Sequence, residues 1–214
     1  MTDFHAFIRD RLPLAELASL PPLALHRASP ASGLGRLLDS LDEESRPPYW
    51  AYVWAGGAAL ARYVLEQPDS VRGKSVFDLG SGSGLVAIAA AKAGARQSQA
   101  SEIDPRGVAA IGLNAAANNV SISVTPGDVT DAAPPVADII MAGDLFYDPD
   151  VAKRVLAYLD RCLDAGLDVL IGDPGRAFLP LHRLRKLAEY DVTDFGLLNA
   201  ETVRSAVFRL EAVA

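Results

Sequence analysis

Acidic side chains lie at or just after the carboxyl end of each stretch that the sequence predicts to be a central strand. Asp78 lies two residues before a glycine-rich run, Gly80–Gly84, and Glu102 lies eighteen residues after that run. Later apolar stretches are followed by carboxylates at Asp128, Asp144 and Asp173. Carboxylates accept hydrogen bonds and attract cations, whereas they repel phosphate groups. The set therefore predicts a site for a ligand that carries positive charge.

Alternating strands and helices would bring these side chains to one edge of a sheet. Apolar stretches predict strands at 74–80, 98–103, 121–125, 137–144 and 167–173. Helical spacing predicts helices within 47–66 and at 85–93, 105–118, 150–164 and 176–187. Two final extended runs, 190–195 and 202–210, predict a hairpin. In such α/β sheets ligands bind beyond the carboxyl ends of the strands.

We therefore predict an α/β fold, with a Rossmann-like, seven-stranded, mostly parallel sheet and helices on both faces. This domain is expected at residues 49–214. Residues 1–48 are expected to be an N-terminal extension of one or two short helices, joined by the stretch "SLPPLALHRASPASG".

Composition narrows the class of protein. The 214 residues carry a net charge of −7 and no stripe of Lys or Arg, which disfavours nucleic-acid binding. No apolar run is long enough to span a bilayer, so no membrane association is expected. The N-terminal stretch resembles neither a signal nor a transit peptide, and the single cysteine suits a reducing compartment. We expect a monomer in the bacterial cytoplasm, with the mitochondrial matrix as the alternative.

The charges select among cofactors that glycine-rich turns can hold. Gly82, Gly84 and Ala87 also fit a dinucleotide fingerprint. A carboxylate at Asp78 would repel the pyrophosphate of NAD or FAD, whereas it would attract the ammonium and sulfonium of S-adenosylmethionine. In this interpretation Asp78 anchors the methionine end and Glu102 accepts from both ribose hydroxyls. Further cofactor contacts are expected from Gly80, Ser81, Gly82, Gly84, Ile103, Asp128 (to the adenine amino group) and Asp144.

Several motifs resemble a known family. "DLGSGSG", "EIDP", "LNAAANN" and "DLFYD" resemble the class I, or seven-β-strand, methyltransferases. The sequence Asp144-Leu145-Phe146-Tyr147 matches the D/E-x-x-Y/F motif of their protein-lysine methyltransferase group. "PPYWAYVWAGGAALARYVLE" and "VLIGDPGR" resemble the lysine methyltransferases of the electron transfer flavoprotein β subunit and their bacterial relatives. The departures are Ala55, Ser83 and Glu102, and none removes a needed functional group.

The resemblance implies a protein-lysine N-methyltransferase that acts on the electron transfer flavoprotein β subunit or a similar protein. It implies that Asp144 accepts hydrogen bonds from the incoming amine as an orienting group, and that Tyr147 and Phe146 wall the lysine channel. It also makes Trp54 a lid over the cofactor. Asp144 and Tyr147 are thus the candidate catalytic residues.

Other interpretations stay open at this point. Trp50 and Trp54, four residues apart, are expected to share a helix face, either at the cofactor or as buried aromatics. Asp128, the "DLFYD" stretch, and Asp173 with Arg176 could each serve only as turns. Cys162 is expected in the core, and no residue spacing suggests a metal site. Alternative functions are methylation of a ribosomal protein or a small molecule, a non-catalytic binding module, and an NAD-dependent oxidoreductase.

Overall fold

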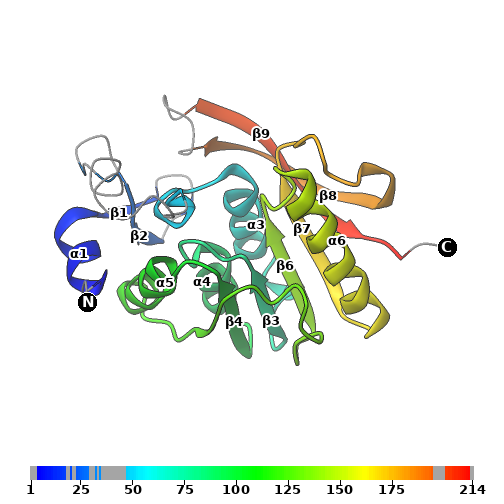
Figure 1. Ribbon diagram of the computed structural model, residues 1–214, viewed down its shortest axis with the longest axis horizontal. Helices are drawn as coiled ribbons and strands as arrows, with labels where there is room; N and C mark the ends of the chain where they lie inside the picture. Colours follow the sequence, from blue (N-terminus) through cyan, green and yellow to red (C-terminus); the bar gives the residue numbers. More distant parts are fainter. Residues whose placement is uncertain are drawn as a thin grey trace.

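The protein is built around one seven-stranded sheet, five strands of which are parallel (Figure 1). The computed structural model describes residues 4–17, 20, 23–28, 32, 34, 47–194 and 201–212. The sheet order is β5-β4-β3-β6-β7-β9-β8, and β9 runs antiparallel between β7 and β8. The strands are β3 (Ser75–Leu79), β4 (Gln97–Glu102), β5 (Ser123–Pro126), β6 (Ile139–Gly143), β7 (Asp168–Asp173), β8 (Leu184–Asp194) and β9 (Glu201–Leu210). The predicted Rossmann-like architecture is confirmed.

Helices cover both faces of this sheet. The first face packs against α3 (Ala55–Glu66), α4 (Leu85–Lys92) and α5 (Pro105–Ala117). The second face packs against α6 (Pro149–Asp164), which lies in front of the sheet in Figure 1. Alternate strand residues supply the two cores: Val76 faces the first, and Phe77 faces the second. Cys162 is buried in the second core, as predicted.

Two helices begin where the sequence places proline after a capping residue. The side chain of Asp104 accepts a hydrogen bond from the backbone N–H of Arg106, and Pro105 opens α5. Asp148 likewise accepts from the second and third residues of α6, whose first residue is Pro149. Such caps satisfy N–H groups that have no partner inside a helix. They also fix the direction in which α5 and α6 leave the ligand-binding edge of the sheet.

The N-terminal segment contains a hairpin that the sequence did not predict. After α1 (Phe4–Arg11), the strands β1 (Leu14–Glu16) and β2 (Ala24–His26) pair antiparallel. Side chains at the end of α5 hold β2: Asn118, the C-cap residue, accepts from the N–H of Ala24 and donates to its carbonyl, and Asn114 accepts from the N–H of His26. α1 agrees with the short helices expected in this extension, whereas β2 falls in the stretch 19–33 that was expected only to join them. Most of residues 29–46 lie outside the described part of the chain.

The C-terminal part corrects a second prediction. The expected helix at 176–187 is absent from this described stretch; a short 3-10 helix, η4 (Leu181–Arg183), leads directly into β8. Pro180 disfavours a continuous helix because it lacks a backbone donor and clashes with the preceding turn. Pairing of β8 with β9 over ten register positions then fixes the extended conformation. The predicted hairpin is confirmed within 190–194 and 202–210, whereas residue 195 is not described.

Two short 3-10 helices flank α3: η2 (Tyr49–Ala51) and η3 (Pro68–Ser70). The second falls in the stretch between α3 and β3. In the described ranges no helix combines the length and the apolar character that crossing a membrane requires.

Candidate active site

The glycine-rich turn between β3 and α4 is organised by a buried carboxylate. Asp78, which is 1 % exposed, accepts hydrogen bonds from the hydroxyl of Ser81 and the backbone N–H of Ala87. Gly80, Gly82 and Gly84 have φ angles of 63°, 58° and 86°, a region that other residues rarely adopt. Burial raises the pKa of Asp78 to about 7. A cation placed beside this carboxylate would favour its ionised form.

Glu102 closes the other side of the same turn. Its carboxylate accepts from the N–H of Gly82 at 2.7 Å and from the N–H of Asp104 at 2.8 Å. Burial raises the pKa of Glu102, while these backbone hydrogen bonds oppose the rise. Each oxygen still has a second lone pair that could accept from a ligand hydroxyl.

A cavity of about 530 Å³ opens between these carboxylates and the ends of β6 and β7. Four carboxylates and one guanidinium are the charged groups among the described residues that line it: Asp78, Glu102, Asp104, Asp144 and Arg176. The volume lies within the range of small-molecule sites. The negative balance fits a ligand with an ammonium and a sulfonium, and it disfavours a pyrophosphate. The residues present therefore fit S-adenosylmethionine.

A smaller cavity of about 130 Å³ adjoins the first and contains Asp128. Gly80, Glu102, Ile103, Leu145 and Tyr147 line both cavities. One oxygen of Asp128 accepts from the N–H and the hydroxyl of Thr130, and the other lies 3.5 Å from Arg154. Asp128 thus shapes a turn and also lines a cavity beside Ile103.

Asp144 stands at the opposite end of the large cavity, directly after β6. Its φ angle of 58° is unusual for a residue other than glycine, and it is 7 % exposed. One carboxylate oxygen accepts from the N–H of Gly57 at 2.9 Å, in the first turn of α3. Asp144 therefore caps α3 from across the fold, since the N-cap residue, Trp54, makes no side-chain hydrogen bond to the helix.

This contact requires α3 to lie almost against the strand ends. A Cβ atom added to Gly172 would lie 2.1 Å from the carbonyl oxygen of Gly56, and one added to Gly143 would lie 2.9 Å from the backbone of Gly57. These distances leave no space for a side chain. Gly56 of "WAGGAAL", where an added Cβ would lie 2.1 Å from the carbonyl oxygen of Gly172, thus has a function that the sequence did not predict, which is to bring the α3 N-terminus to Asp144.

The second oxygen of Asp144 is paired with Arg176, an interaction that the sequence did not predict. Nη2 and Nε of Arg176 donate to this oxygen at 2.7 and 3.2 Å. The guanidinium carbon also lies 5.8 Å from the centre of the Trp54 ring. Burial raises the pKa of Asp144 to about 6, although Arg176 opposes the rise. Asp144 is consequently ionised at neutral pH.

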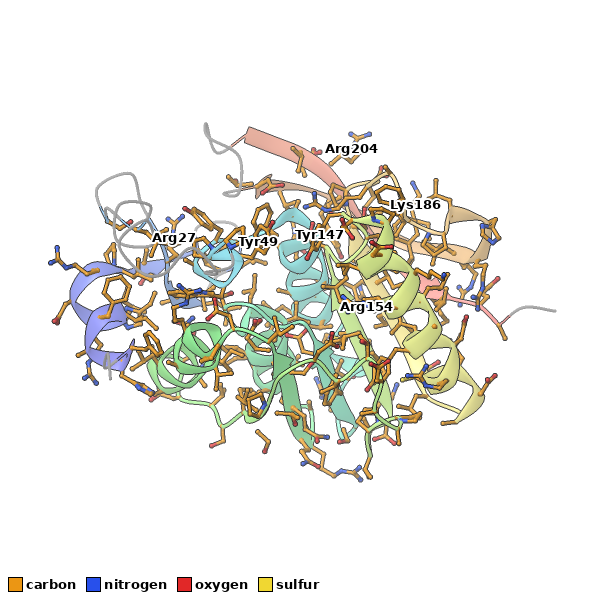
Figure 2. All side chains as sticks on the ribbon, in the orientation of Figure 1. Arg27, Tyr49, Tyr147, Arg154, Lys186 and Arg204 are labelled. Atoms are coloured by element: carbon orange, nitrogen blue, oxygen red, sulfur yellow. The ribbon has the colours of Figure 1, made fainter. Side chains whose placement is uncertain are left out.

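Aromatic side chains form the rim of the cavity. The centre of the Trp54 ring lies 5.7 Å from that of Tyr49 and 6.2 Å from that of Tyr52. The ring centres of Tyr49 and Tyr147 are 5.8 Å apart. Figure 2 labels Tyr49 and Tyr147, which lie near the upper end of the sheet in that view. Both are nearly half exposed. We define Tyr49, Tyr52, Trp54 and Tyr147 as the aromatic rim; Tyr49 and Tyr52 are members that the sequence analysis missed.

Two aromatic predictions are wrong. Phe146 is 1 % exposed and packs in the core under α6, so it does not wall the channel. Trp50 and Trp54 do not share a helix face, because Trp50 lies in η2 and Trp54 precedes α3 in an extended conformation. Trp50 is 2 % exposed and packs between α1 and α5, although its edge reaches the cavity.

The structure thus brings most predicted site residues to one cavity. Asp78, Gly80, Ser81, Gly82, Glu102, Ile103, Asp144, Tyr147 and Trp54 line the larger cavity. Gly84 lies behind it against Ile111, and Asp128 lines the smaller neighbour. Across the described ranges, no group of three or more His, Cys, Asp or Glu side chains is arranged to hold a metal ion.

Comparison with known proteins points to one fold and to a set of close relatives. Residues 59–146 match the family model for ribosomal protein L11 methyltransferase. The electron transfer flavoprotein β subunit lysine methyltransferase of Rattus norvegicus is 44 % identical over 153 residues, which covers 69 % of this chain and 60 % of the relative. The human protein of the same name is 42 % identical over the same length. The chain spans about 60 % of the length of these curated relatives.

Solved structures agree on the fold. A Pyrococcus horikoshii protein provisionally described as an RNA methyltransferase superposes with a TM-score of 0.60 at 20 % identity, covering 85 % of this chain and 97 % of its own. Magnesium protoporphyrin IX methyltransferase from Synechocystis, with S-adenosylhomocysteine bound, gives 0.53 at 13 % identity, covering 85 % and 95 %. This chain therefore has the class I methyltransferase fold, and its curated relatives include lysine methyltransferases of the electron transfer flavoprotein β subunit.

Proposed function

We propose that this chain is an S-adenosylmethionine-dependent protein-lysine N-methyltransferase, with its catalytic domain at 49–214 and residues 1–48 as an N-terminal extension. One observation carries the proposal: a single cavity joins a pair of buried carboxylates at a glycine turn to an ionised Asp144 beneath an aromatic rim. The first end suits a cationic nucleoside, and the second suits an amine. The lysine methyltransferases among its relatives support the same function.

The chain's own residues would hold the cofactor along the cavity. Asp78 and the turn of Gly80, Ser81, Gly82 and Gly84 would bind the methionine end, and Glu102 would accept from the ribose hydroxyls. Ile103 and Asp128 would contact the adenine, and Trp54 would cover the cofactor. When bound, S-adenosylmethionine supplies a methyl group already activated by its sulfonium.

Asp144 and Tyr147 would position the nucleophile. A lysine amine must lose a proton before it attacks, which costs about 4–5 kcal/mol at neutral pH for an unperturbed pKa. Enclosure by the aromatic rim and proximity to a sulfonium lower that pKa. Asp144, ionised at neutral pH, would accept a hydrogen bond from the amine and orient its lone pair.

We propose the electron transfer flavoprotein β subunit, or a similar protein, as the substrate, because proteins with that activity in their names are 42–44 % identical. A cytoplasmic monomer that binds neither membranes nor nucleic acid completes the proposal, with the mitochondrial matrix as the alternative compartment. The match to ribosomal protein L11 methyltransferase favours a ribosomal protein as the second candidate substrate.

Methyl transfer to purified partners tests the proposal. The protein is incubated with radiolabelled S-adenosylmethionine and either the flavoprotein β subunit or ribosomal protein L11, and modified residues are mapped by mass spectrometry. We expect label on lysines of the flavoprotein subunit and none with Asp144→Asn. Label on ribosomal protein L11 alone would show that L11, and not the flavoprotein subunit, is the substrate. Tight cofactor binding without transfer to any protein in a cell extract would refute the protein-methyltransferase function.

A further inference from the structure

Three buried carboxylates surround one guanidinium at the amine end of the cavity. Asp144 follows β6, Asp173 ends β7 and Asp194 ends β8; they are 7 %, 1 % and 5 % exposed. All three raise the pKa of Arg176 through their charge. Asp144 and Asp173 thus place two buried carboxylates beside one guanidinium, and buried charge is costly unless it is paired.

One oxygen in this cluster has no partner. Oδ1 of Asp173 accepts from the backbone N–H groups of Gly175 and Arg176, both at 2.7 Å. Oδ2 of Asp173 is buried and makes no hydrogen bond to the described residues. A buried carboxylate oxygen without a donor is rare in proteins, so it calls for an explanation.

Arg176 occupies the position that a substrate amine would need. The backbone N–H of Gly57 donates to one oxygen of Asp144, and the guanidinium of Arg176 is the cation at the other oxygen, at 2.7 Å. The same guanidinium lies over the Trp54 ring, as an ammonium in an aromatic pocket would. Its side chain lines the cavity and is 23 % exposed.

We propose that the guanidinium of Arg176 occupies the binding site of the substrate lysine while no substrate is bound. An incoming lysine ammonium then displaces Arg176 from Asp144 toward the unpaired oxygen of Asp173. This inference rests on the proposed function and names the amine subsite as Asp144 beneath Trp54. The backbone of Arg176 is fixed by Asp173, so only its side chain needs to move. The exchange keeps Asp144 paired with a cation throughout.

The exchange also explains why the site would select a cationic side chain in the substrate. A neutral side chain that displaced Arg176 would leave the buried Asp144 carboxylate unpaired, which is strongly unfavourable. A lysine ammonium replaces one positive charge with another, and the displaced guanidinium gains Asp173 as a partner. Proton loss before methyl transfer would then follow entry of the amine.

A binding measurement tests the displacement without requiring catalysis. n-Butylamine, which reproduces the end of a lysine side chain, is titrated calorimetrically at pH 8 into protein saturated with S-adenosylhomocysteine. Arg176→Met removes the competing cation and keeps an unbranched side chain. If Arg176 occupies Asp144 for nine tenths of the time, this variant binds n-butylamine about tenfold more tightly than the wild type. Asp144→Asn in either background abolishes binding.

Arg183→Met is the matched control, since Arg183, the last residue of η4, pairs with Asp160 at 2.7 Å and is absent from both cavity linings. It should leave amine affinity unchanged. Arg176→Gln provides a second charge-neutral variant if Arg176→Met does not fold. Equal or weaker amine binding by a folded Arg176 variant that still binds S-adenosylhomocysteine would overturn the inference, even if the wild type methylates its partner. A tenfold gain would support it even if no protein substrate is methylated.

Discussion

The two ends of the cavity are constructed in different ways. At the cofactor end, Asp78 and Glu102 are bound by backbone N–H groups that all lie within residues 76–104. At the amine end, Trp54, Asp144 and Arg176 come from three separate parts of the chain. The first end is thus a local β-α-β unit, whereas the second exists only after α3, β6 and β7 have assembled.

Because the two ends are built from different parts of the chain, cofactor affinity and methyl-transfer rate should depend on different residues. Changes at the local end should weaken cofactor binding and leave the amine subsite intact. Changes at the assembled end should reduce methyl transfer or fold stability while cofactor affinity is retained. Each variant below tests that separation.

The largest effect is expected at Asp144. Asp144→Asn removes the carboxylate that we propose orients the amine, and methyl transfer should fall by about 10³-fold. Initial rates with labelled cofactor measure the loss, and calorimetry measures cofactor affinity separately. A comparable loss of cofactor affinity would contradict the division, because it would place Asp144 chiefly at the cofactor end.

A large loss of stability is expected where α3 packs closely on the ends of β6 and β7. In Gly172→Ala the new methyl group meets the carbonyl of Gly56, so urea unfolding should show a loss of about 3 kcal/mol or more. Gly112 in α5 has nothing within 4 Å of the corresponding position. Gly112→Ala should therefore stabilise the protein by about 0.5–1 kcal/mol. Equal stability of the two variants would exclude the close approach.

Glu102 tests the cofactor end. Glu102→Ala removes the proposed acceptor for the ribose hydroxyls, at about 1.5–3 kcal/mol for a hydrogen bond to a charged group, so affinity should fall by about 100-fold. At saturating cofactor the turnover should stay near that of the wild type. Glu66→Ala, at an exposed pair with Arg62, should change neither value. Loss of turnover with unchanged cofactor affinity in Glu102→Ala would show that Glu102 acts in methyl transfer and not in cofactor binding.

Asp78 gives the cofactor end a pH dependence. Because its pKa in the folded protein is about 7, the carboxylate is protonated as pH falls below 7, and cofactor affinity should drop by about tenfold per pH unit there. Stability of the free protein should show the opposite trend. The folded-state pKa exceeds the unfolded one, so protonation favours folding, and this contribution is lost as pH rises through 7.

Asp78→Asn should flatten both trends, which calorimetry and thermal unfolding at pH 5.5–8.5 would reveal. Asp144, with its pKa of about 6, adds a stability change of the same sign at lower pH. Cofactor affinity that rises below pH 7 would exclude an ionised Asp78 as the anchor.

The smallest effect is expected where the N-terminal hairpin meets α5. Asn118→Ala removes the hydrogen bonds to Ala24 and should cost about 1–2 kcal/mol, seen as faster proteolysis of residues 1–28. Asn119→Gly is the matched control, because Asn119 is exposed and has a φ of 56° that glycine accepts readily. Methyl transfer should persist in both variants. Unchanged protection in Asn118→Ala would show that the hydrogen bonds of Asn118 do not hold the hairpin.

The cofactor end could be predicted from the sequence because its geometry is local. The spacing of Asp78, the glycines and Glu102 specifies a strand, a left-handed turn and a helix, and those elements place the side chains. The fold was equally accessible, since apolar periodicity marks each central strand. The charges of Asp78 and Glu102 even selected the class of ligand.

The amine end could not be predicted in the same way. Arg176 and Asp144 are 32 residues apart, and the stretch around Arg176 was expected to be helical. Its true conformation depends on Pro180 and on pairing with β9, a long-range interaction. Likewise, the hairpin that ends at His26 depends on Asn114, 88 residues away, whose Oδ1 accepts from the N–H of His26 and whose Nδ2 donates to the carbonyl of Ser83 in the glycine loop. Contacts between residues so far apart in the sequence cannot be predicted from short motifs.

A crystal structure of the protein with S-adenosylhomocysteine and a lysine-containing peptide of its substrate tests the central claim most directly. We expect the cofactor's ribose on Glu102 and the peptide amine within hydrogen-bonding distance of Asp144, with the guanidinium of Arg176 displaced toward Asp173. A cofactor that leaves Glu102 untouched, or an amine that approaches from a side other than the aromatic rim, would contradict it.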